Sequence, residues 1–183
     1  MNKQVLFIHD AGQQKPDEAG SSLGASLQNA LDLAYEVVRP HMPAPDNPRY
    51  AAWAAQVEKE LAVLEGEAIL VGHSLGGAVL LKYLSEHPST KPLAGLFLIA
   101  PAYWGKDGEW INDEYTLQED FPSHLPEVQQ IFLYHSRDDA VVPFAHLALY
   151  AEKLPQATVR ELDGRGHFFT DGLPELADDI KGL

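Results

Sequence analysis

Short apolar runs alternate with helical patterns along nearly all of this chain, and this alternation limits the possible folds more than any other feature. Six runs have the length and continuity of strands buried on both faces, and they cover residues 3–10, 34–40, 67–74, 93–102, 129–136 and 157–164. Five stretches have apolar residues at helical spacing, and they cover residues 21–33, 50–64, 75–86, 144–154 and 174–180. Such alternation is typical of right-handed crossovers between parallel strands. The sequence therefore predicts an α/β fold, with a six-stranded, mainly parallel sheet and helices on both faces.

The expected strand order is 2-1-3-4-5-6, which places the third strand beside the first at the point where the order reverses. Folds of this class bind ligands at that point. Two segments interrupt the alternation of strands and helices. Residues 40–48 contain four prolines and are predicted to form an extended connection. Residues 103–126 are polar, acidic and aromatic, and are predicted to form an excursion at one end of the sheet.

Length and composition fit one domain that covers residues 1–183. With 45% hydrophobic residues, the chain can bury a sizeable core. Neither a signal peptide nor an apolar stretch of membrane-spanning length is recognisable, so we expect a cytoplasmic protein without membrane attachment. The absence of cysteine excludes disulfides and a thiol nucleophile. The excess of 27 Asp and Glu over 13 Lys and Arg gives a formal charge of −14, which argues against nucleic acid as a partner.

The sequence GHSLG at residues 72–76 has the pattern G-x-S-x-G between a predicted strand and a predicted helix. Glycines at both ends of this pattern permit a strained turn, because side chains there would collide with neighbouring backbone. The serine hydroxyl then stands exposed above the sheet, and the start of the helix directs N–H groups toward developing negative charge. Ser74 is therefore a candidate nucleophile. The alternative is that Ser74 only caps the helix.

A serine nucleophile needs a base and an orienting acid, and candidates for both follow later strands at their carboxyl ends. Asp138 and Asp139 end one strand before a Val-Val-Pro stop, and His167 follows a glycine-rich turn. The order Ser74, Asp139, His167 is the Ser-Asp-His order of the α/β-hydrolase arrangement. No group of residues has metal-ligand spacing such as H-E-x-x-H, so neither a metal nor another cofactor is expected.

A resemblance to a known family rests on six stretches that occur in the family's order: VLFIHDAG, PHMPAPDNPRYAAW, LVGHSLGG, IAPAYW, SRDDAVVP and GRGHFF. With them the chain resembles the small lidless serine hydrolases typified by retinoblastoma-binding protein nine and its bacterial relatives, within the α/β-hydrolase superfamily. The resemblance covers nearly the whole chain. The family's D-x-x-V-P turn matches residues 139–143, which implies that Asp139 is the orienting acid. Because Asp138 is adjacent, either aspartate is expected to replace the other in part.

An oxyanion hole needs two N–H donors that point at the oxygen of the tetrahedral intermediate. The geometry of the G-x-S-x-G turn assigns one donor to the backbone of Leu75. The resemblance places the other at Ala11. Asp10 stands where the family commonly has glycine. Either the Asp10 carboxylate faces away from the oxyanion, or the loop has another shape and the assignment of Ala11 fails.

Three aromatic residues of the excursion, Tyr103, Trp104 and Trp110, are candidates for the wall of a substrate pocket. Equally, they could cover the end of the sheet and fill space, as aromatic side chains usually do. The histidines near the candidate site are expected to have structural roles. His73 is expected to pack or hydrogen-bond locally, His9 to hold the oxyanion loop, and His135 and His146 to support the turn of the acid.

Motif and resemblance together imply a serine hydrolase, similar to carboxylesterases, that cleaves a small ester, thioester or amide through an acyl-enzyme. Its partner would be a small-molecule acyl substrate. A peptidase and a lactonase use the same machinery, and both stay open. A protein-binding module with weak activity also stays open, because the named relative is known for a protein partner. A flavodoxin-like cofactor binder is disfavoured, since residues 9–20 lack a phosphate-binding glycine pattern.

Overall fold

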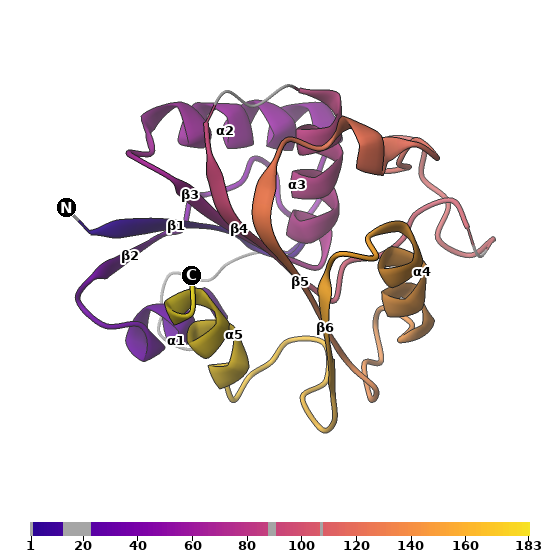
Figure 1. Ribbon diagram of the computed structural model, residues 1–183. Coiled ribbons are helices and arrows are strands. Elements are labelled where there is room, and N and C mark those ends of the chain that lie inside the picture. The colour runs from indigo at the N-terminus through magenta and orange to yellow at the C-terminus, as the bar shows by residue number, and fades with distance from the viewer. Residues whose placement is uncertain (1, 13–22, 88–90, 107) are drawn as a thin grey trace.

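The computed structural model describes residues 2–12, 23–87, 91–106 and 108–183. Within these residues, six strands form one sheet with the order β2-β1-β3-β4-β5-β6, and all neighbouring pairs are parallel (Figure 1). The strands are β1 (Lys3–Ile8), β2 (Tyr35–Val38), β3 (Ala68–His73), β4 (Leu93–Ile99), β5 (Val128–Ser136) and β6 (Thr158–Leu162). The predicted fold class and strand order are thereby confirmed.

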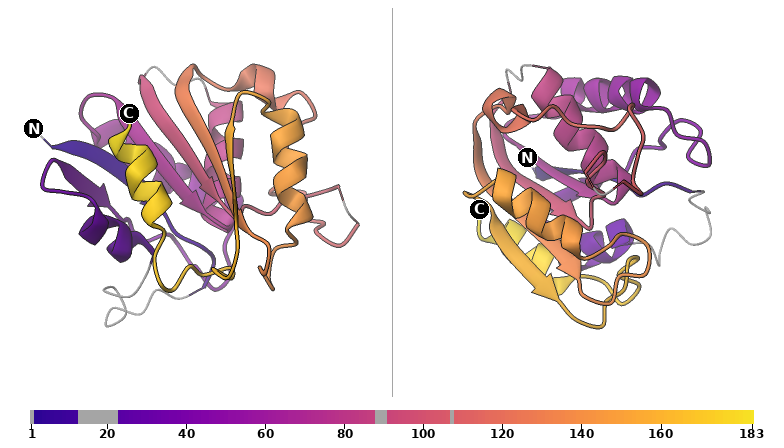
Figure 2. Two further views of the ribbon diagram at one scale, coloured as in Figure 1. Left: turned by 60° about the horizontal axis from the view of Figure 1, so that its bottom comes forward. Right: turned by 90° about the vertical axis from the view of Figure 1, so that its right-hand side faces the viewer.

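Helices pack on both faces of the sheet, as Figures 1 and 2 show. One face carries α1 (Leu23–Ala30) and α5 (Pro174–Lys181). The other face carries α2 (Tyr50–Val63), α3 (Leu75–Glu86), α4 (Ala145–Lys153) and the short 3-10 helix η2 (Phe121–His124). The five predicted α-helices are present, although residues 21 and 22 of the first lie outside the described residues. The sequence did not predict η2.

The sheet separates two apolar cores, because successive side chains of a strand point to opposite faces. On β1, Leu6 and Ile8 belong to the core under α2, α3 and α4, whereas Val5 and Phe7 belong to the core under α1 and α5. The central strands β3 and β4 are buried along their whole length. Burial of this apolar surface stabilises the fold by about 25 cal/mol per Å². The loops that follow these strands therefore start from fixed positions.

Burial on both faces was predicted for every strand, and this prediction is wrong for the edge strands β2 and β6. No residue of β6 is fully buried, and β2 alternates between buried and less buried positions. Each edge strand pairs with only one neighbour, so solvent reaches its other side. β6 itself carries charge: Arg160 pairs with Asp179 of α5 over 2.7 Å, and Glu161 pairs with Arg137. Charged side chains at a sheet edge oppose pairing with another sheet.

Residues 40–48 join β2 to α2 without regular structure, as four prolines require. The segment is not extended throughout, in contrast to the prediction, because the Asn47 N–H donates to the Ala44 carbonyl oxygen over 2.9 Å and closes a turn. The Gly12 N–H donates to the carbonyl oxygen of Pro45 over 2.8 Å. This turn therefore holds the loop that follows β1.

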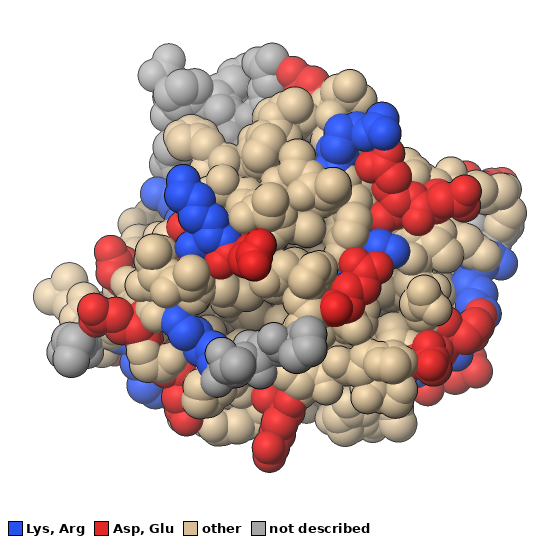
Figure 3. All heavy atoms as spheres, turned by 90° about the horizontal axis from the view of Figure 1, so that it is seen from above, with Lys and Arg blue, Asp and Glu red and all other residues tan. Residues whose placement is uncertain are grey.

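Charged side chains of both signs occur on the surface (Figure 3). On the face shown in Figure 3, acidic and basic residues lie side by side, and that face shows no extended basic patch. Ion pairs of this kind include Glu119, which pairs with both Lys106 and Lys153. None of the helices in the described residues is long and apolar enough to cross a bilayer.

Candidate active site

Ser74 occupies the sharp turn between β3 and α3. A Cβ atom on Gly72 would lie 2.5 Å from the nearest backbone atom of α3, and a Cβ atom on Gly76 would collide with the carbonyl oxygens of Ile8 and His9. Both positions therefore exclude any side chain. Ser74 itself has φ +52° and ψ −119°, a conformation that L residues rarely adopt. Such strain costs about 1–3 kcal/mol and is typical of functional sites.

The hydroxyl of Ser74 faces His167 and not the helix that follows. Ser74 Oγ lies 2.9 Å from His167 Nε2, and the serine makes no side-chain cap on α3. Ser74 occupies the position before α3, but the alternative that its hydroxyl only caps the helix does not fit these contacts. The serine hydroxyl instead donates to an imidazole nitrogen, which is the contact that a serine nucleophile needs with its base.

His167 follows β6 in a glycine-rich turn, and its side chain is almost fully buried. Its Nδ1 lies 2.7 Å from Asp139 Oδ2. Because a carboxylate only accepts, Nδ1 carries the hydrogen, and Nε2 presents its lone pair to the hydroxyl of Ser74. We call Ser74, His167 and Asp139 the Ser–His–Asp cluster. Its members follow β3, β6 and β5, and the carboxyl ends of these three strands lie at the same end of the parallel sheet.

The side chain of Asp139 is fully excluded from solvent and accepts hydrogen bonds on both oxygens. Oδ2 accepts from His167 Nδ1 and from His135 Nε2 at 3.1 Å, and Oδ1 accepts from the backbone N–H groups of Val141 at 2.8 Å and Val142 at 2.9 Å. Burial alone would raise the pKa of Asp139, but these donors outweigh burial and hold the pKa well below its usual range. The carboxylate therefore stays ionised beside the imidazole.

Asp138 has a different set of partners from its neighbour. Its Oδ1 accepts from Ser136 Oγ and from the Gly166 N–H at 3.3 Å. Ser136 Oγ in turn accepts from the Arg165 N–H over 3.1 Å. Asp138 therefore holds the turn that leads into His167 and does not contact the imidazole. The expectation that either aspartate can replace the other does not fit this arrangement.

The backbone N–H groups of Leu75 and Ala11 are the candidate oxyanion donors. Leu75 opens α3 directly after Ser74, so its N–H has no acceptor within its own helix. Ala11 lies exposed in the loop after β1. This loop starts against the serine turn, because the carbonyl oxygen of His9 packs on Gly76. The role of both groups as donors stays a prediction.

Asp10 turns its carboxylate toward His73, a fully buried residue that sequence reasoning gave only a local role. Asp10 Oδ1 lies 3.8 Å from His73 Nδ1, and His73 Nε2 donates to the carbonyl oxygen of His167 over 2.8 Å. Burial lowers the pKa of His73, against the opposing effect of Asp10. The Asp10 carboxylate lies near the buried His73 ring, and the alternative that it faces away from the oxyanion stays a prediction. The only signal in the sequence was the position of His73 beside Ser74.

Structural roles were predicted for the other histidines near the site. The Nδ1 atom of His9 donates to the carbonyl oxygen of Asp10, and His146 Nδ1 accepts from the Tyr103 N–H over 2.9 Å. His135 differs, because it reaches the carboxylate of the Ser–His–Asp cluster. The sequence did not predict that contact, although His135 lies only four residues before Asp139 on the same strand end.

The three aromatic residues proposed for a pocket wall have different environments. Tyr103 is buried in the core with its ring centroid 4.7 Å from that of Tyr150, so it follows the space-filling alternative. Trp104 and Trp110 pack edge to face with centroids 5.0 Å apart. The Nε1–H group of Trp104 is buried and has no acceptor among the described residues. Pocket roles for the two tryptophans stay predictions.

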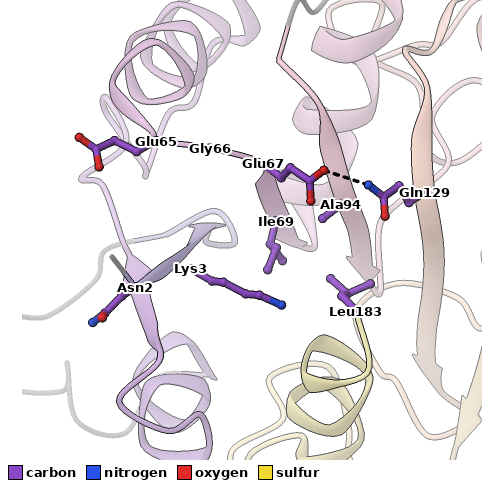
Figure 4. Close-up of a pocket in the computed structure, with 9 residues that line it drawn as sticks. All are labelled: Asn2, Lys3, Glu65, Gly66, Glu67, Ile69, Ala94, Gln129 and Leu183. Carbon is purple, nitrogen blue, oxygen red and sulfur yellow. Dashed lines mark hydrogen bonds between the residues drawn. The ribbon is translucent and has the colours of Figure 1, made fainter.

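A cavity of about 460 Å³ lies at the opposite end of the strands, where β1, β3 and β4 begin (Figure 4). The side chains of Lys3, Ile69 and Leu183 extend toward its centre (Figure 4). Glu67 accepts a hydrogen bond from Gln129 at its rim over 3.3 Å. Because the Ser–His–Asp cluster follows the carboxyl ends of the strands, this cavity is not part of the candidate active site.

Known proteins resemble this chain over nearly its whole length. The family model described as Serine hydrolase matches residues 25–173. YdeN of Bacillus subtilis (strain 168), whose name calls it a hydrolase, is 27% identical over 172 residues, which are 93% of this chain and 88% of YdeN.

Solved structures share the fold. The crystal structure of the ydeN gene product from B. subtilis matches with a TM-score of 0.81 at 23% identity and covers 99% of this chain and 98% of that chain. Est1E from Butyrivibrio proteoclasticus has a TM-score of 0.71 at 15% identity, with 99% and 86% covered, and Arabidopsis thaliana SOBER1 has 0.67 at 16%, with 100% and 97% covered. This fold is the α/β-hydrolase fold. Because the family model spans most of the chain and all of the Ser–His–Asp cluster, this protein belongs to the serine hydrolase family.

Proposed function

We propose that this protein cleaves a small ester, thioester or amide through a covalent acyl-enzyme on Ser74. The observation that carries the proposal is the chain of two hydrogen bonds, 2.9 Å from Ser74 Oγ to His167 Nε2 and 2.7 Å from His167 Nδ1 to Asp139 Oδ2. His167 takes the hydroxyl proton while Ser74 Oγ attacks the carbonyl carbon, and Asp139 stabilises the imidazolium. His167 then gives the proton to the leaving group. A water molecule repeats the two steps and releases the acid.

The negative oxygen of the tetrahedral intermediate needs donors that are in place beforehand. We assign this role to the N–H groups of Leu75 and Ala11. The positive end of the α3 dipole adds to the stabilisation, since Leu75 is the first residue of that helix. We infer that the negative charge of Asp10 is directed away from the oxyanion, and the 3.8 Å approach of its carboxylate to His73 Nδ1 supports this.

Apolar side chains beside the cluster support a substrate with an apolar acyl or alcohol group. Val141 is 46% exposed two residues after Asp139, and Phe168 is 55% exposed directly after His167. The ring of Phe168 stands edge-on to that of His167, with centroids 5.1 Å apart. Exposed apolar groups at a site are available to be covered by a ligand. Est1E, which shares the fold, has been solved with ferulic acid bound, so aromatic acyl esters belong among the substrates to be tested.

A fluorophosphonate probe, read by intact mass, tests whether Ser74 is activated. Wild-type protein is expected to gain one adduct, and the Ser74→Ala variant is expected to gain none. Ser85→Ala serves as the matched control, because Ser85 lies in α3, the helix that follows Ser74, and its hydroxyl donates to the Lys82 carbonyl oxygen. If folded wild-type protein takes up no probe, the cluster does not activate its serine and the proposal fails.

A substrate panel then separates the reaction classes that share this machinery. p-Nitrophenyl esters of increasing acyl length, a thioester, a lactone and a peptide amide are compared by kcat/KM. Preference for simple esters or thioesters is the expected result. Turnover confined to the peptide amide would make the protein a peptidase, and the proposed substrate class would be wrong.

A further inference from the structure

Two imidazoles share one oxygen of the acid in the Ser–His–Asp cluster. His135 lies at the carboxyl end of β5 and is fully buried. Its Nε2 lies 3.1 Å from Asp139 Oδ2, which is also 2.7 Å from His167 Nδ1. The same nitrogen lies 3.1 Å from the carbonyl oxygen of Val142. The reaction proposed above leaves His135 without a part in proton transfer.

The hydrogen of the His135 imidazole can be placed from its contacts. Both atoms that face Nε2 are acceptors, so Nε2 carries the hydrogen. Nδ1 is buried and has no hydrogen-bond partner among the described residues. A hydrogen on Nδ1 would be an unpaired buried donor, which folded proteins avoid. The neutral tautomer with Nε2–H fits this environment, and it is a donor to Asp139.

The other oxygen of Asp139 is fixed by backbone. Oδ1 accepts from the N–H groups of Val141 at 2.8 Å and Val142 at 2.9 Å. These two bonds fix one oxygen, so the position of Oδ2 depends on its own donors. Those donors are His167 Nδ1 and His135 Nε2. His135 supplies a third anchor, from a strand that pairs with β4 on one side and β6 on the other.

We propose that His135 is a positioning residue that holds Asp139 Oδ2 on the line toward His167 Nδ1. This inference rests on the function proposed for the cluster. The Nε2–H group of His135 also offsets part of the negative charge on Oδ2. When this donor is lost, more of that charge acts on His167, and the imidazolium form of His167 is stabilised. The acid limb of the pH–rate profile then moves to higher pH, whereas loss of packing alone would not move it.

The groups around this hydrogen-bonded pair can be named. The ring of Phe144 stands edge-on to His135 with centroids 5.6 Å apart, and the Arg137 guanidinium lies over that ring at 5.1 Å. The centroid of the His73 ring lies 5.2 Å from that of His167, and the Asp10 carboxylate lies 3.8 Å from His73 Nδ1. A substitution at His135 leaves these groups chemically unchanged. A shifted profile therefore reports on the link between the acid and the base.

The test compares two variants of His135 with a control on the same strand. His135→Leu removes the donor, and His135→Gln restores an amide N–H of similar reach. Tyr134→Phe is the control, because it removes a buried hydroxyl that donates to Asp179 over 2.7 Å and lies in the opposite core. The concentration of reactive sites in each full-length protein is determined by titration of a sample with the fluorophosphonate. The kcat of untreated protein is then expressed per reactive site, which is called a labelled site below. Ester hydrolysis is then measured across pH.

In His135→Leu, kcat per labelled site is expected to fall about tenfold to a hundredfold, as displaced catalytic groups typically cause. KM should stay within about twofold of wild type, because a residue that acts on the transition state alone changes kcat. The acid limb should move to higher pH. His135→Gln should recover most of kcat and the wild-type limb, and Tyr134→Phe should match wild type in both.

Two results would overturn the positioning role: a fully labelled His135→Leu protein with wild-type kcat and pH profile, or a folded His135→Gln protein as impaired as the leucine variant. Should the leucine variant not fold, His135→Asn replaces it, because the shorter amide does not reach Oδ2. Failure of the proposed function has a different signature. In that case folded wild-type protein is itself unlabelled.

Discussion

The imidazole of His73 donates from Nε2 to the carbonyl oxygen of His167 over 2.8 Å, and the two ring centroids lie 5.2 Å apart. His73 ends β3 directly before Ser74, so this single hydrogen bond joins the strand of the serine to the loop of the base. The ring of Phe169 packs edge-on against His73 at 6.0 Å. The separation of Ser74 and His167 is thereby set before a substrate binds, which is the condition for efficient attack.

Replacing His73 by leucine is expected to impair stability and turnover together. The His167 carbonyl oxygen would lose its buried partner, which costs about 1–3 kcal/mol. The base loop would lose its link to the serine turn, and kcat should fall by about tenfold or more. Thermal unfolding and ester hydrolysis per labelled site measure both effects. The control is His124→Leu, at an exposed residue whose partner is Asp120. A His73→Leu protein with the melting temperature and kcat of that control would refute the link.

Strain at Ser74 predicts a stability difference between two inactive variants. The serine has φ +52° and ψ −119°, which glycine adopts readily and alanine does not. Ser74→Gly relieves about 1–2 kcal/mol of steric cost, offset in part by about 0.5–1 kcal/mol from the more flexible unfolded chain. Ser74→Gly should therefore be more stable than Ser74→Ala in urea unfolding. Equal midpoints would show that the conformation carries no strain.

The two adjacent aspartates are expected to respond very differently to replacement by asparagine. All four groups that face the oxygens of Asp139 are donors: two backbone N–H groups on one side and the His135 and His167 imidazoles on the other. In Asp139→Asn, the NH₂ group of the amide must therefore face either the two backbone N–H groups or the two imidazoles. The second choice imposes the wrong tautomer on His167. By comparison with other Ser-His-Asp enzymes, kcat should fall about 10⁴-fold.

Asp138→Asn is the matched control for that variant. Its carbonyl oxygen can still accept from Ser136 and Gly166, so the turn before His167 is kept. We expect kcat within about tenfold of wild type, because the imidazole keeps its partner. If the two asparagine variants lose similar activity, or if Asp138→Asn loses more, Asp139 is not the orienting acid.

The turn at Ser74 and the central strands could be predicted, because each depends on a short local pattern of residue types. The glycines at 72 and 76 leave no space for side chains, and that requirement appears in the sequence as G-x-S-x-G. The central strands are apolar throughout, so their burial could be inferred from residue type alone. Asp139 and His167 could be placed at the same end of the sheet, because the carboxyl ends of parallel strands all lie there.

The features that escaped prediction depend on contacts between distant residues. Burial of β6 was predicted although Arg160 and Glu161 lie within it, and its position at the edge of the sheet leaves every one of its residues at least partly exposed. The pairing of Asp10 with His73 depends on how the loop after β1 meets the serine turn. The reach of His135 to Asp139 depends on the turn after β5, whose backbone N–H groups hold the carboxylate in range. Residue spacing encodes none of these distances.

The lowered pKa of Asp139 predicts how stability changes in acid. The folded protein resists protonation of this carboxyl, whereas the unfolded chain takes up the proton near its ordinary pKa of about 3.9. The contribution is therefore complete above that pH and is lost as pH falls below it. Urea unfolding of Asp139→Asn should show a flatter decline in the free energy of unfolding below about pH 4 than wild type.

Glu119 provides a comparison for this pH effect. Hydrogen bonds from Lys106 and Lys153 lower the pKa of Glu119 to about 2, but its side chain is exposed. Glu119→Gln should lose the part of the acid dependence of the free energy of unfolding that Glu119 contributes. Because salt screens exposed ion pairs, about 0.5 M NaCl should remove the same part from the wild-type protein. The dependence due to Asp139 should persist in that salt. If salt abolishes both, Asp139 is not held by buried donors.

An apolar rim at the active site predicts a change in substrate preference when Phe168 is shortened. In Phe168→Ala, kcat/KM for butyrate and longer acyl esters should fall about tenfold, since a covered aromatic side chain contributes about 1.5–3 kcal/mol and 1.4 kcal/mol corresponds to tenfold. Acetate esters should be nearly unaffected, because they are too short to cover the ring. Leu33→Ala is the control, as Leu33 is an exposed apolar side chain in the turn between α1 and β2. An equal loss for short and long esters would mean that Phe168 supports His167, whose ring it touches, and that the apolar group of the substrate binds elsewhere.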